Sequence, residues 1–442
     1  MTTIDSPVLQ SGVKKAMVRI IPFAFLCFFL SFLDRVNLSY AALTMNADIG
    51  LSDAAYGLGA GIFFIGYFVF EVPSNLLLNR FGARIWISRI MITWGVISAC
   101  MALVSNEPIF YILRFLLGVA EAGFFPGIIF YFTKWFPLRN RGRATALFMT
   151  AMPISGIIGA PLSGWILGLD GFMNMSGWQI LFIVEGVPSI IVGFLVLIFL
   201  PDNPTKVKWL SKEEASAIIE ALATEEKAAA SGGHSTLRDA FKSPLVWWLS
   251  LAFFGTVTSL LSLSFWLPTI IQSLTGQGTM MTTLISALPY IFAAASMILI
   301  ARSSDRTGER RLHTSIAAAT AGVALVLCVF SPNPVMTIGL LCVVAAGIYG
   351  CNGTFWTIST ARLAGTAAAA GIAWINSIGN LGGFVGPYVL GWLREYTGGD
   401  QIGMAFLAVL AFMSAAILFV VGPKRKKSPE VTVSTKKIAH HS

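Results

Sequence analysis

Two adjacent charged residues, Asp34 and Arg35, lie inside an apolar stretch that covers residues 20–43. An ionised side chain in hydrocarbon costs roughly 2.5 to 3.5 kcal/mol on insertion scales, so two of them together indicate a polar cavity. Arg35 offers a planar fork of donors that suits a carboxylate, and Asp34 can exchange a proton once it is desolvated. We therefore expect Arg35 to bind an anion and Asp34 to carry a proton. The alternative is an ion pair between helices that only stabilises the bundle.

A third charged residue, Glu121, lies in the middle of another apolar stretch, RFLLGVAEAGFFPG. Burial disfavours the charged form of a carboxylate, so Glu121 could exchange a proton near neutral pH. Arg114 precedes it by seven residues and lies on roughly the same helix face. We predict a proton-coupling role for Glu121 and a structural or relay role for Arg114. The alternative is an Arg114–Glu121 ion pair that only packs the helices together.

Two further acids, Glu71 and Glu185, fall inside apolar stretches, and we expect gating or structural roles for both. Glu71 lies near the end of its stretch, where a gate contact is favoured over coupling. The one histidine within the bounds of a predicted span is His313, the third residue of 311–331, which we expect in the cytoplasmic loop, so a proton relay in the membrane must use carboxylates.

The composition indicates an all-α protein that crosses the membrane many times. Of 442 residues, 56% are hydrophobic and 12% are charged, and the mean hydropathy is +0.76. Soluble proteins carry about 25% charged residues, and the apolar runs here have the length of membrane helices. The five cysteines form no CxxC pair, and no nucleotide-binding or metal-ligand motif appears. We expect no metal and no cofactor.

Twelve apolar stretches divide the chain into two sets of six. We predict a six-helix N-terminal half (1–200), a cytoplasmic central loop (201–243), a six-helix C-terminal half (244–421) and a cytoplasmic tail (422–442). The predicted spans are 17–45, 54–78, 83–104, 108–133, 143–169, 178–200, 244–273, 279–302, 311–331, 334–360, 365–395 and 401–421. The central loop includes an amphipathic segment that we expect to be a short helix.

Lysine and arginine concentrate in alternate loops. Of the 30 basic residues, only Arg35, Arg114 and Arg394 fall outside the termini, the central loop and every second connection. By the positive-inside rule, both termini and the central loop are predicted to be cytoplasmic, in a bacterial-type inner membrane. The net charge of +9 is therefore an anchoring pattern, and we expect no nucleic-acid partner.

The chain also repeats itself. Residues 79–84 (NRFGAR) match residues 305–310 (DRTGER), and residues 156–161 (GIIGAP) match residues 382–387 (GGFVGP). Both matches have an offset of 226 residues, which indicates a duplicated six-helix unit. Parallel repeats of this kind are typical of secondary transporters, whose substrate site lies between the halves.

The chain resembles the major facilitator superfamily and, within it, the anion:cation symporter family over nearly its full length. The match rests on FLDRVN (32–37), AEAGF (120–124), WFP (135–137), EG (185–186), FWLP (265–268), SDRTGERR (304–311) and GNLGG (379–383). The resemblance implies a monomer that imports organic anions with protons, and it supports Asp34 and Glu121 as the protonation pair. Substrates in the family include aldonates, tartrate, phthalate and 4-hydroxyphenylacetate. Asn79 replaces the family's acid in the first loop motif, while Asp305 and Arg306 keep the second, with expected gating or structural roles.

Four residues are predicted to contact the substrate, namely Tyr67, Trp356, Thr357 and Asn376, with Trp266 and Met152 as weaker candidates. An organic acid needs hydrogen-bond partners and a flat wall besides the arginine. The competing interpretation is that these side chains only pack or anchor at interfaces; the family resemblance favours contact. Their polar groups favour a hydroxycarboxylate, and an aromatic acid is the alternative.

Other functions stay open at this point. Within transport they are efflux, sodium coupling and facilitated diffusion. Outside transport, a transporter-like anion sensor would need a signalling domain, for which the loops are too short. An enzyme would need a nucleophile and a base, and no such set is recognisable in the cytoplasmic loops.

Overall fold

The computed structural model describes residues 6–230, 242–362 and 367–422, and its regular elements are helices. Part of the predicted central loop and nearly all of the tail lie outside the described residues. In chain order the α-helices are α1 (Pro7–Ile49), α2 (Asp53–Phe81), α3 (Ala83–Cys100), α4 (Glu107–Glu121), α5 (Phe124–Thr133), α6 (Leu138–Met149), α7 (Ala151–Leu167), α8 (Gly177–Phe199), α9 (Lys212–Ala230), α11 (Pro244–Thr275), α12 (Thr279–Thr307), α13 (Arg311–Val329), α14 (Pro334–Arg362), α15 (Ala367–Thr397) and α16 (Gln401–Val421).

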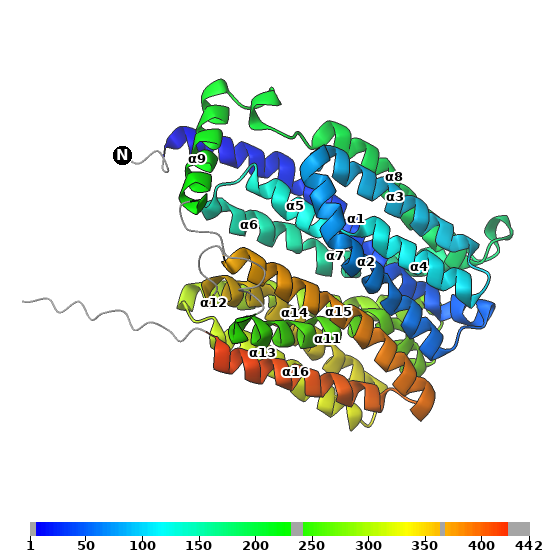
Figure 1. The fold of residues 1–442 in the computed structure, drawn as a ribbon. Coiled ribbons are helices and arrows are strands. Elements are labelled where there is room, and N and C mark those ends of the chain that lie inside the picture. Colours follow the sequence, from blue (N-terminus) through cyan, green and yellow to red (C-terminus); the bar gives the residue numbers. More distant parts are fainter. Residues whose placement is uncertain (1–5, 231–241, 363–366, 423–442) are drawn as a thin grey trace, which may run out of the picture.

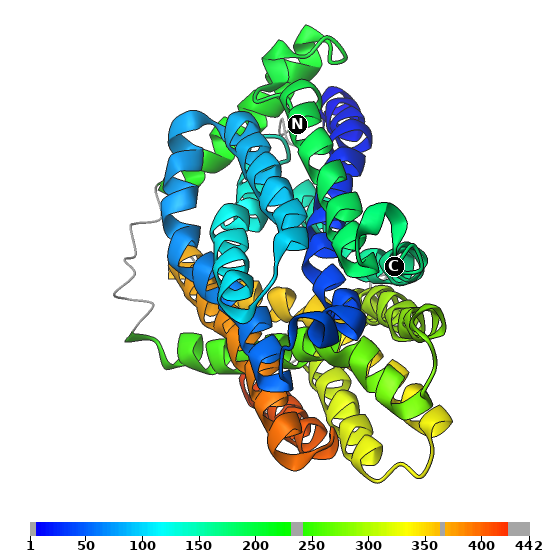
Figure 2. The same ribbon diagram turned by 90° about the vertical axis from the view of Figure 1, so that its right-hand side faces the viewer.

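The helices form two bundles of six membrane segments each. Eleven segments of the described chain are long and apolar enough to cross a membrane, and the twelfth predicted span corresponds to α15. Figures 1 and 2 show the first bundle, α1 to α8, lying against the second, α11 to α16. The main contacts between the bundles run between α2 and α15 and between α7 and α12.

Two predicted spans are interrupted. The span predicted at 108–133 breaks between α4 and α5, because Ala122 leaves the helical region with a ψ of 131° and Gly123 has a φ of 85°. The Ser74 hydroxyl donates a 2.6 Å hydrogen bond to the carbonyl of Ala122, which the break frees. The span predicted at 143–169 breaks at Thr150, between α6 and α7. Interrupted helices at membrane depth occur where the backbone is buried in protein or lines a cavity.

Helix α1 starts ten residues before the predicted span and is 43 residues long. At 1.5 Å per residue it extends about 65 Å, well beyond a hydrocarbon core of roughly 30 Å. Its first turns pack against α9, where Glu214 lies 2.7 Å from Lys15. We call this the α9 end of the bundle; the far end is where α1 stops and α2 begins.

The two halves are closely joined at the far end. Arg394 of α15 forms ion pairs with Asp53 of α2 at 3.0 Å and with Asp400 at 2.6 Å. The Tyr56 hydroxyl donates to the carbonyl of Phe265 at 2.9 Å. A Cβ at Gly57 would lie 2.5 Å from the Pro387 carbonyl oxygen, so the α2–α15 contact requires glycine here. These contacts explain why Arg394 departs from the basic pattern of the loops.

Candidate functional site

A cavity of about 100 Å³ lies between the two halves. Its walls are largely aromatic, with Phe28, Phe32, Phe64, Phe124, Phe125 and Phe253 among them. Among the described residues, the ionisable groups that line it come from the first half. The polar lining is Ser31, Arg35, Tyr67 and Glu121 from that half, and Asn352, Trp356, Asn376 and Asn380 from the second. The site thus combines a cation, an acid and neutral hydrogen-bonding groups within aromatic walls.

Arg35 and Glu121 form an ion pair at the edge of this cavity, between the guanidinium Nη2 and the carboxylate Oε1. The Ser31 hydroxyl donates to the same oxygen at 2.8 Å. Four aromatic rings surround the guanidinium, with Phe63 closest at 5.2 Å from the ring centroid. The buried Nε of Arg35 has no hydrogen-bond partner within the described chain. Arg35 therefore keeps donor capacity for an anion.

Glu121 is the last residue of α4, directly before the break at Ala122 and Gly123, and it lines the cavity. The alternative pair with Arg114 does not form. Arg114 is 1% exposed and donates to the backbone carbonyls of Gly59 and Ala60 at 3.1 and 3.3 Å. These hydrogen bonds join α4 to α2.

Asp34 lies inside the first half rather than in the cavity lining. Its carboxylate accepts hydrogen bonds from Ser189 at 2.7 Å, from Trp94 Nε1 at 2.8 Å and from Ser98 at 3.0 Å. No ion pair to Asp34 is present in the part of the chain that the structure describes. Adjacent positions on a helix point about 100° apart, which is why Asp34 and Arg35 face different surroundings. The hydrogen bonds tie α1 to α3 and α8.

The second half contributes amide side chains. Asn376 Nδ2 donates to Glu71 Oε1 at 3.1 Å, so Glu71 of α2 and Asn376 of α15 join the halves beside the cavity. Trp356 stands at 64° to the ring of Phe253, with the centroids 4.9 Å apart. Three of the four predicted contacts, Tyr67, Trp356 and Asn376, thus lie in the lining.

Thr357 does not line the cavity, contrary to the prediction. Its hydroxyl donates to the carbonyl of Thr354 at 2.6 Å, because the position after Trp356 is turned about 100° away on the helix. Of the weaker candidates, Met152 lines the cavity. Trp266 does not, and its indole donates to the carbonyl of Pro387 at 3.1 Å.

Sequence reasoning missed Ser31, Asn352 and Asn380. Each lies four positions from a predicted residue: Ser31 from Arg35, Asn352 from Trp356 and Asn380 from Asn376. Residues four apart share a helix face. The sequence pattern that could have identified them is a polar residue one helical turn from a predicted site residue.

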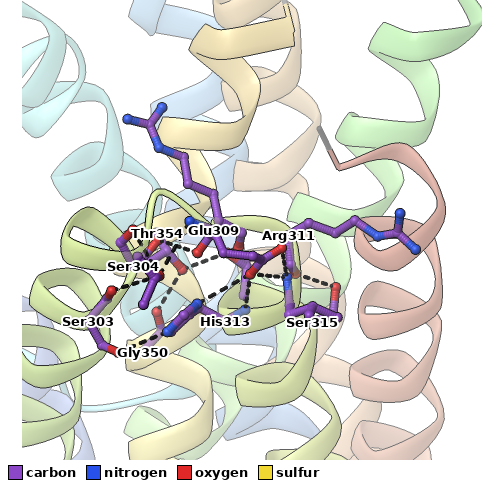
Figure 3. Close-up of polar contacts among 12 residues, drawn as sticks. Ser303, Ser304, Glu309, Arg311, His313, Ser315, Gly350 and Thr354 are labelled. Carbon is purple, nitrogen blue, oxygen red and sulfur yellow. Dashed lines mark hydrogen bonds and ion pairs between the residues drawn. The ribbon is translucent and has the colours of Figure 1, made fainter. Parts of the chain in front are cut away.

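The two loop motifs lie at the α9 end and differ in how they are capped. In the first, the backbone N–H of Arg84 donates to Asp202 at 3.2 Å, so an acid from beyond α8 caps α3 although Asn79 is neutral. In the second, Glu309 accepts from the N–H of Leu312, and His313 is hydrogen-bonded to Ser303 (Figure 3). His313 lies on the first turn of α13 rather than in a loop. The side chains of Asp305 and Arg306 are exposed.

The sequence is similar to known proteins over most of its length. The chain matches the Major Facilitator Superfamily over residues 24–387. It is 46% identical over 417 residues to a protein named putative tartrate transporter from Agrobacterium vitis, covering 94% of this chain and 92% of that protein. It is 42% identical over 425 residues to a quinolone resistance transporter from Acinetobacter baumannii, covering 96% and 98%.

Among solved structures, the xylose transporter XylE from Escherichia coli, in a partially occluded inward-open conformation, has a TM-score of 0.74 to this chain. The match covers 94% of this chain and 99% of that one at 15% identity, so it shows the fold alone. The family match adds what the fold alone does not. This chain is a transport protein rather than an enzyme, and it belongs to the Major Facilitator Superfamily.

Proposed function

We propose that the protein imports a small hydroxylated carboxylate, such as tartrate or an aldonate, together with protons. The observation that carries this proposal is the Arg35–Glu121 ion pair at a cavity between the halves. The relative named putative tartrate transporter supports the substrate class. The basic loops favour a bacterial inner membrane with the α9 end and both termini in the cytoplasm.

The ion pair provides a way to make anion binding depend on a proton. While Glu121 is ionised, its carboxylate pairs with the Arg35 guanidinium. A substrate carboxylate that bound there would then add a second buried negative charge. Protonation of Glu121 neutralises it and frees the guanidinium donors for the substrate carboxylate. By linkage, proton and anion then favour each other's binding, which is the requirement for symport.

Asp34 is the proposed second proton site. As an anion it accepts hydrogen bonds that hold α1 against α3 and α8. A proton on Asp34 removes one acceptor position and makes the group a donor, which loosens this packing. Alternating access needs such a bistable element. Protonation of Asp34 would thereby connect the gradient to the movement of α1.

The amides of the second half are proposed to hydrogen-bond to the substrate groups other than the carboxylate. Asn352 and Asn380 offer both donors and acceptors to substrate hydroxyls, while Asn376 and Glu71 act as a gate between the halves. Opening the far end requires loss of the Arg394–Asp53 ion pair. We thus propose that the contacts of Glu71 and Arg394 close the pathway on opposite sides of the substrate site.

An aromatic acid is the second candidate, favoured by the phenylalanine walls of the cavity and by Trp356. The same Arg35 would bind its carboxylate, while the ring would stack on these walls. Offset or edge-on aromatic contacts contribute about 0.5 to 1.5 kcal/mol each. This candidate differs from the first in substrate and shares its coupling scheme.

The test is transport by the purified protein in proteoliposomes that contain a pH-sensitive dye. Tartrate, galactonate, rhamnonate, phthalate, 4-hydroxyphenylacetate and neutral sugars are added outside, against protein-free vesicles. Protein-dependent acidification of the lumen by a hydroxy acid is expected. Acidification by the aromatic acids alone would select the second candidate, and uptake without acidification would contradict proton symport.

A further inference from the structure

A stripe of polar residues runs along α1 from Asp34 to the far end. Asn37, Tyr40 and Thr44 lie at i, i+3 and i+7 spacing and so share one face of α1, and Asn37 is three residues after Asp34. The Asn37 Oδ1, the Tyr40 hydroxyl and the Thr44 hydroxyl are each buried without a hydrogen-bond partner within the described residues. An unsatisfied buried polar atom costs about 1 to 3 kcal/mol, and buried water usually satisfies such groups. The stripe is therefore suited to hold a chain of waters.

Glu185 of α8 shares a helix face with Ser189, which contacts Asp34 at the start of this stripe. Glu185 is 2% exposed, its Oε1 accepts from the Ser163 hydroxyl at 2.9 Å, and its Oε2 has no partner within the described chain. No lysine, arginine or histidine of the described chain forms an ion pair with it. A buried carboxyl without a cation is stable when it carries a proton and can release it to an acceptor nearby.

Two polar side chains lie beside Asp34 on its Glu185 side. Ser189, one helical turn after Glu185, donates to Asp34 Oδ2 at 2.7 Å. Asn37, the first residue of the stripe after Asp34, has its Nδ2 3.5 Å from Asp34 Oδ1. A hydroxyl and an amide, which can both donate and accept, are thus available next to Asp34 for waters that lead to Glu185.

Glu185 lies on the far-end side of Asp34. Trp178, two turns before Glu185 on α8, donates to Asp48 at the far end of α1 at 2.8 Å. The titratable groups around Glu185 are Asp34 and Tyr40 of α1, with Tyr290 of α12 and Tyr349 of α14 beyond Tyr40. Helix α7 contributes Ser163, and α3 packs its Gly95 backbone against Gly186.

We propose that Glu185 is a third proton carrier, which relays protons from water at the far end to Asp34. This inference rests on the proposed proton symport. The Glu185 carboxylate accepts a proton from a hydrated proton in the stripe. The carboxylic acid then gives a proton to a bridging water, which passes one to the Asp34 carboxylate, so charge and atoms balance without redox chemistry. Asn37 and Tyr40 position the waters.

The experiment compares Glu185→Gln with wild type in two assays on the same proteoliposomes. The first is uptake driven by a pH gradient, and the second is substrate exchange at equal pH. The variant is expected to keep exchange and to lose gradient-driven uptake by about tenfold or more, in line with the loss of a proton-transfer group. Its uptake should rise further as the outside pH is lowered, over a range in which the wild-type rate is already constant.

Three controls keep the outcomes separate. Absence of proton coupling in wild type would contradict the proposed function, whereas wild-type coupling with an unaltered rate and pH profile in Glu185→Gln would overturn the relay. Equal loss of uptake and exchange would assign Glu185 a structural role. Ser155→Ala is the matched control, because Ser155 is bonded to the Met152 carbonyl of its own helix. If Glu185→Gln does not fold, Tyr40→Phe decides: the relay predicts slowed gradient-driven uptake with intact exchange, and unchanged uptake would overturn it.

Discussion

The two halves share a repeat but differ in where they carry charge. The interior of the first half holds Asp34, Arg35, Glu71, Arg114, Glu121 and Glu185. The interior of the second half, residues 244–275, 279–301, 314–361, 371–393 and 401–421, has no aspartate, glutamate, lysine or arginine. Cavity groups from the second half are asparagines and aromatic rings. We infer a division of labour: the first half binds the carboxylate and the protons, and the second half selects the substrate.

The backbone follows the same division. The fourth span of the first half breaks at Ala122 and Gly123, directly after Glu121. Its counterpart 226 residues later falls at Ile348 and Tyr349, within the continuous helix α14. In the second copy of the repeat the helix is continuous at this position and no charged residue is near it in the sequence. In the first copy the helix is interrupted directly after a carboxylate that lines the cavity.

The largest expected effect is on Arg35. Arg35→Lys keeps the positive charge but loses the planar fork, so we expect substrate affinity to fall about 30-fold, which corresponds to roughly 2 kcal/mol for hydrogen bonds to a charged group. Isothermal titration of the purified protein measures this. Arg302→Lys on the exposed surface is the matched control. Unchanged affinity of Arg35→Lys would move the carboxylate site away from the first half.

The next effect concerns the helix break. Gly123→Ala should lower thermal stability, by about 1 to 3 kcal/mol, because a φ of 85° strains any L side chain and a Cβ would lie 2.4 Å from the Ser74 hydroxyl. Gly142→Ala, in open space on α6, is the control and should not lower the unfolding midpoint, because alanine is more favourable than glycine inside a helix. Equal midpoints for both variants would show that the break is not a required feature.

A smaller effect is expected from the second half. Asn380→Ala removes one neutral hydrogen bond to the substrate, so affinity should fall about fivefold, or roughly 1 kcal/mol. The number of protons carried per substrate should not change. Flux measurements with substrate and pH readouts report both quantities. A changed proton stoichiometry in this variant would contradict the inference that the first half alone binds the protons.

The smallest effect concerns the α9 end of the first half. Hydrogen bonds from Lys15 and Ser11 lower the pKa of the Glu214 carboxyl to about 2. The folded state therefore gains stability from Glu214 above the ordinary carboxyl pKa of about 4.3 and loses that gain as the pH falls towards 2. Limited proteolysis of α9 should become faster over this acidic range. In Glu214→Gln, proteolysis of α9 should already be faster than in wild type at neutral pH. Equal rates of proteolysis at neutral pH would show that the Glu214 contacts with Lys15 and Ser11 do not hold α9 in place.

Much of this arrangement was predictable from the sequence. Apolar runs and basic loops indicated twelve spans in two sets, and the isolated charges Asp34, Arg35 and Glu121 indicated that the first half carries the charged groups in or beside the cavity. The sequence did not reveal that Arg35 pairs with Glu121 instead of leaving Glu121 to Arg114. Helical periodicity also does not report the break at Ala122 and Gly123, which ends α4 directly after Glu121. Thr357 was misplaced because neighbouring positions on α14 face different surroundings.

The most direct test of the central claim is Glu121→Gln, studied in proteoliposomes with and without a pH gradient. The amide cannot ionise, so it mimics the protonated acid and leaves Arg35 free for the substrate. We predict that substrate exchange at equal pH is retained while accumulation driven by the gradient is abolished. Normal accumulation by Glu121→Gln would contradict the account, because proton binding at the Arg35–Glu121 pair would then have no part in transport.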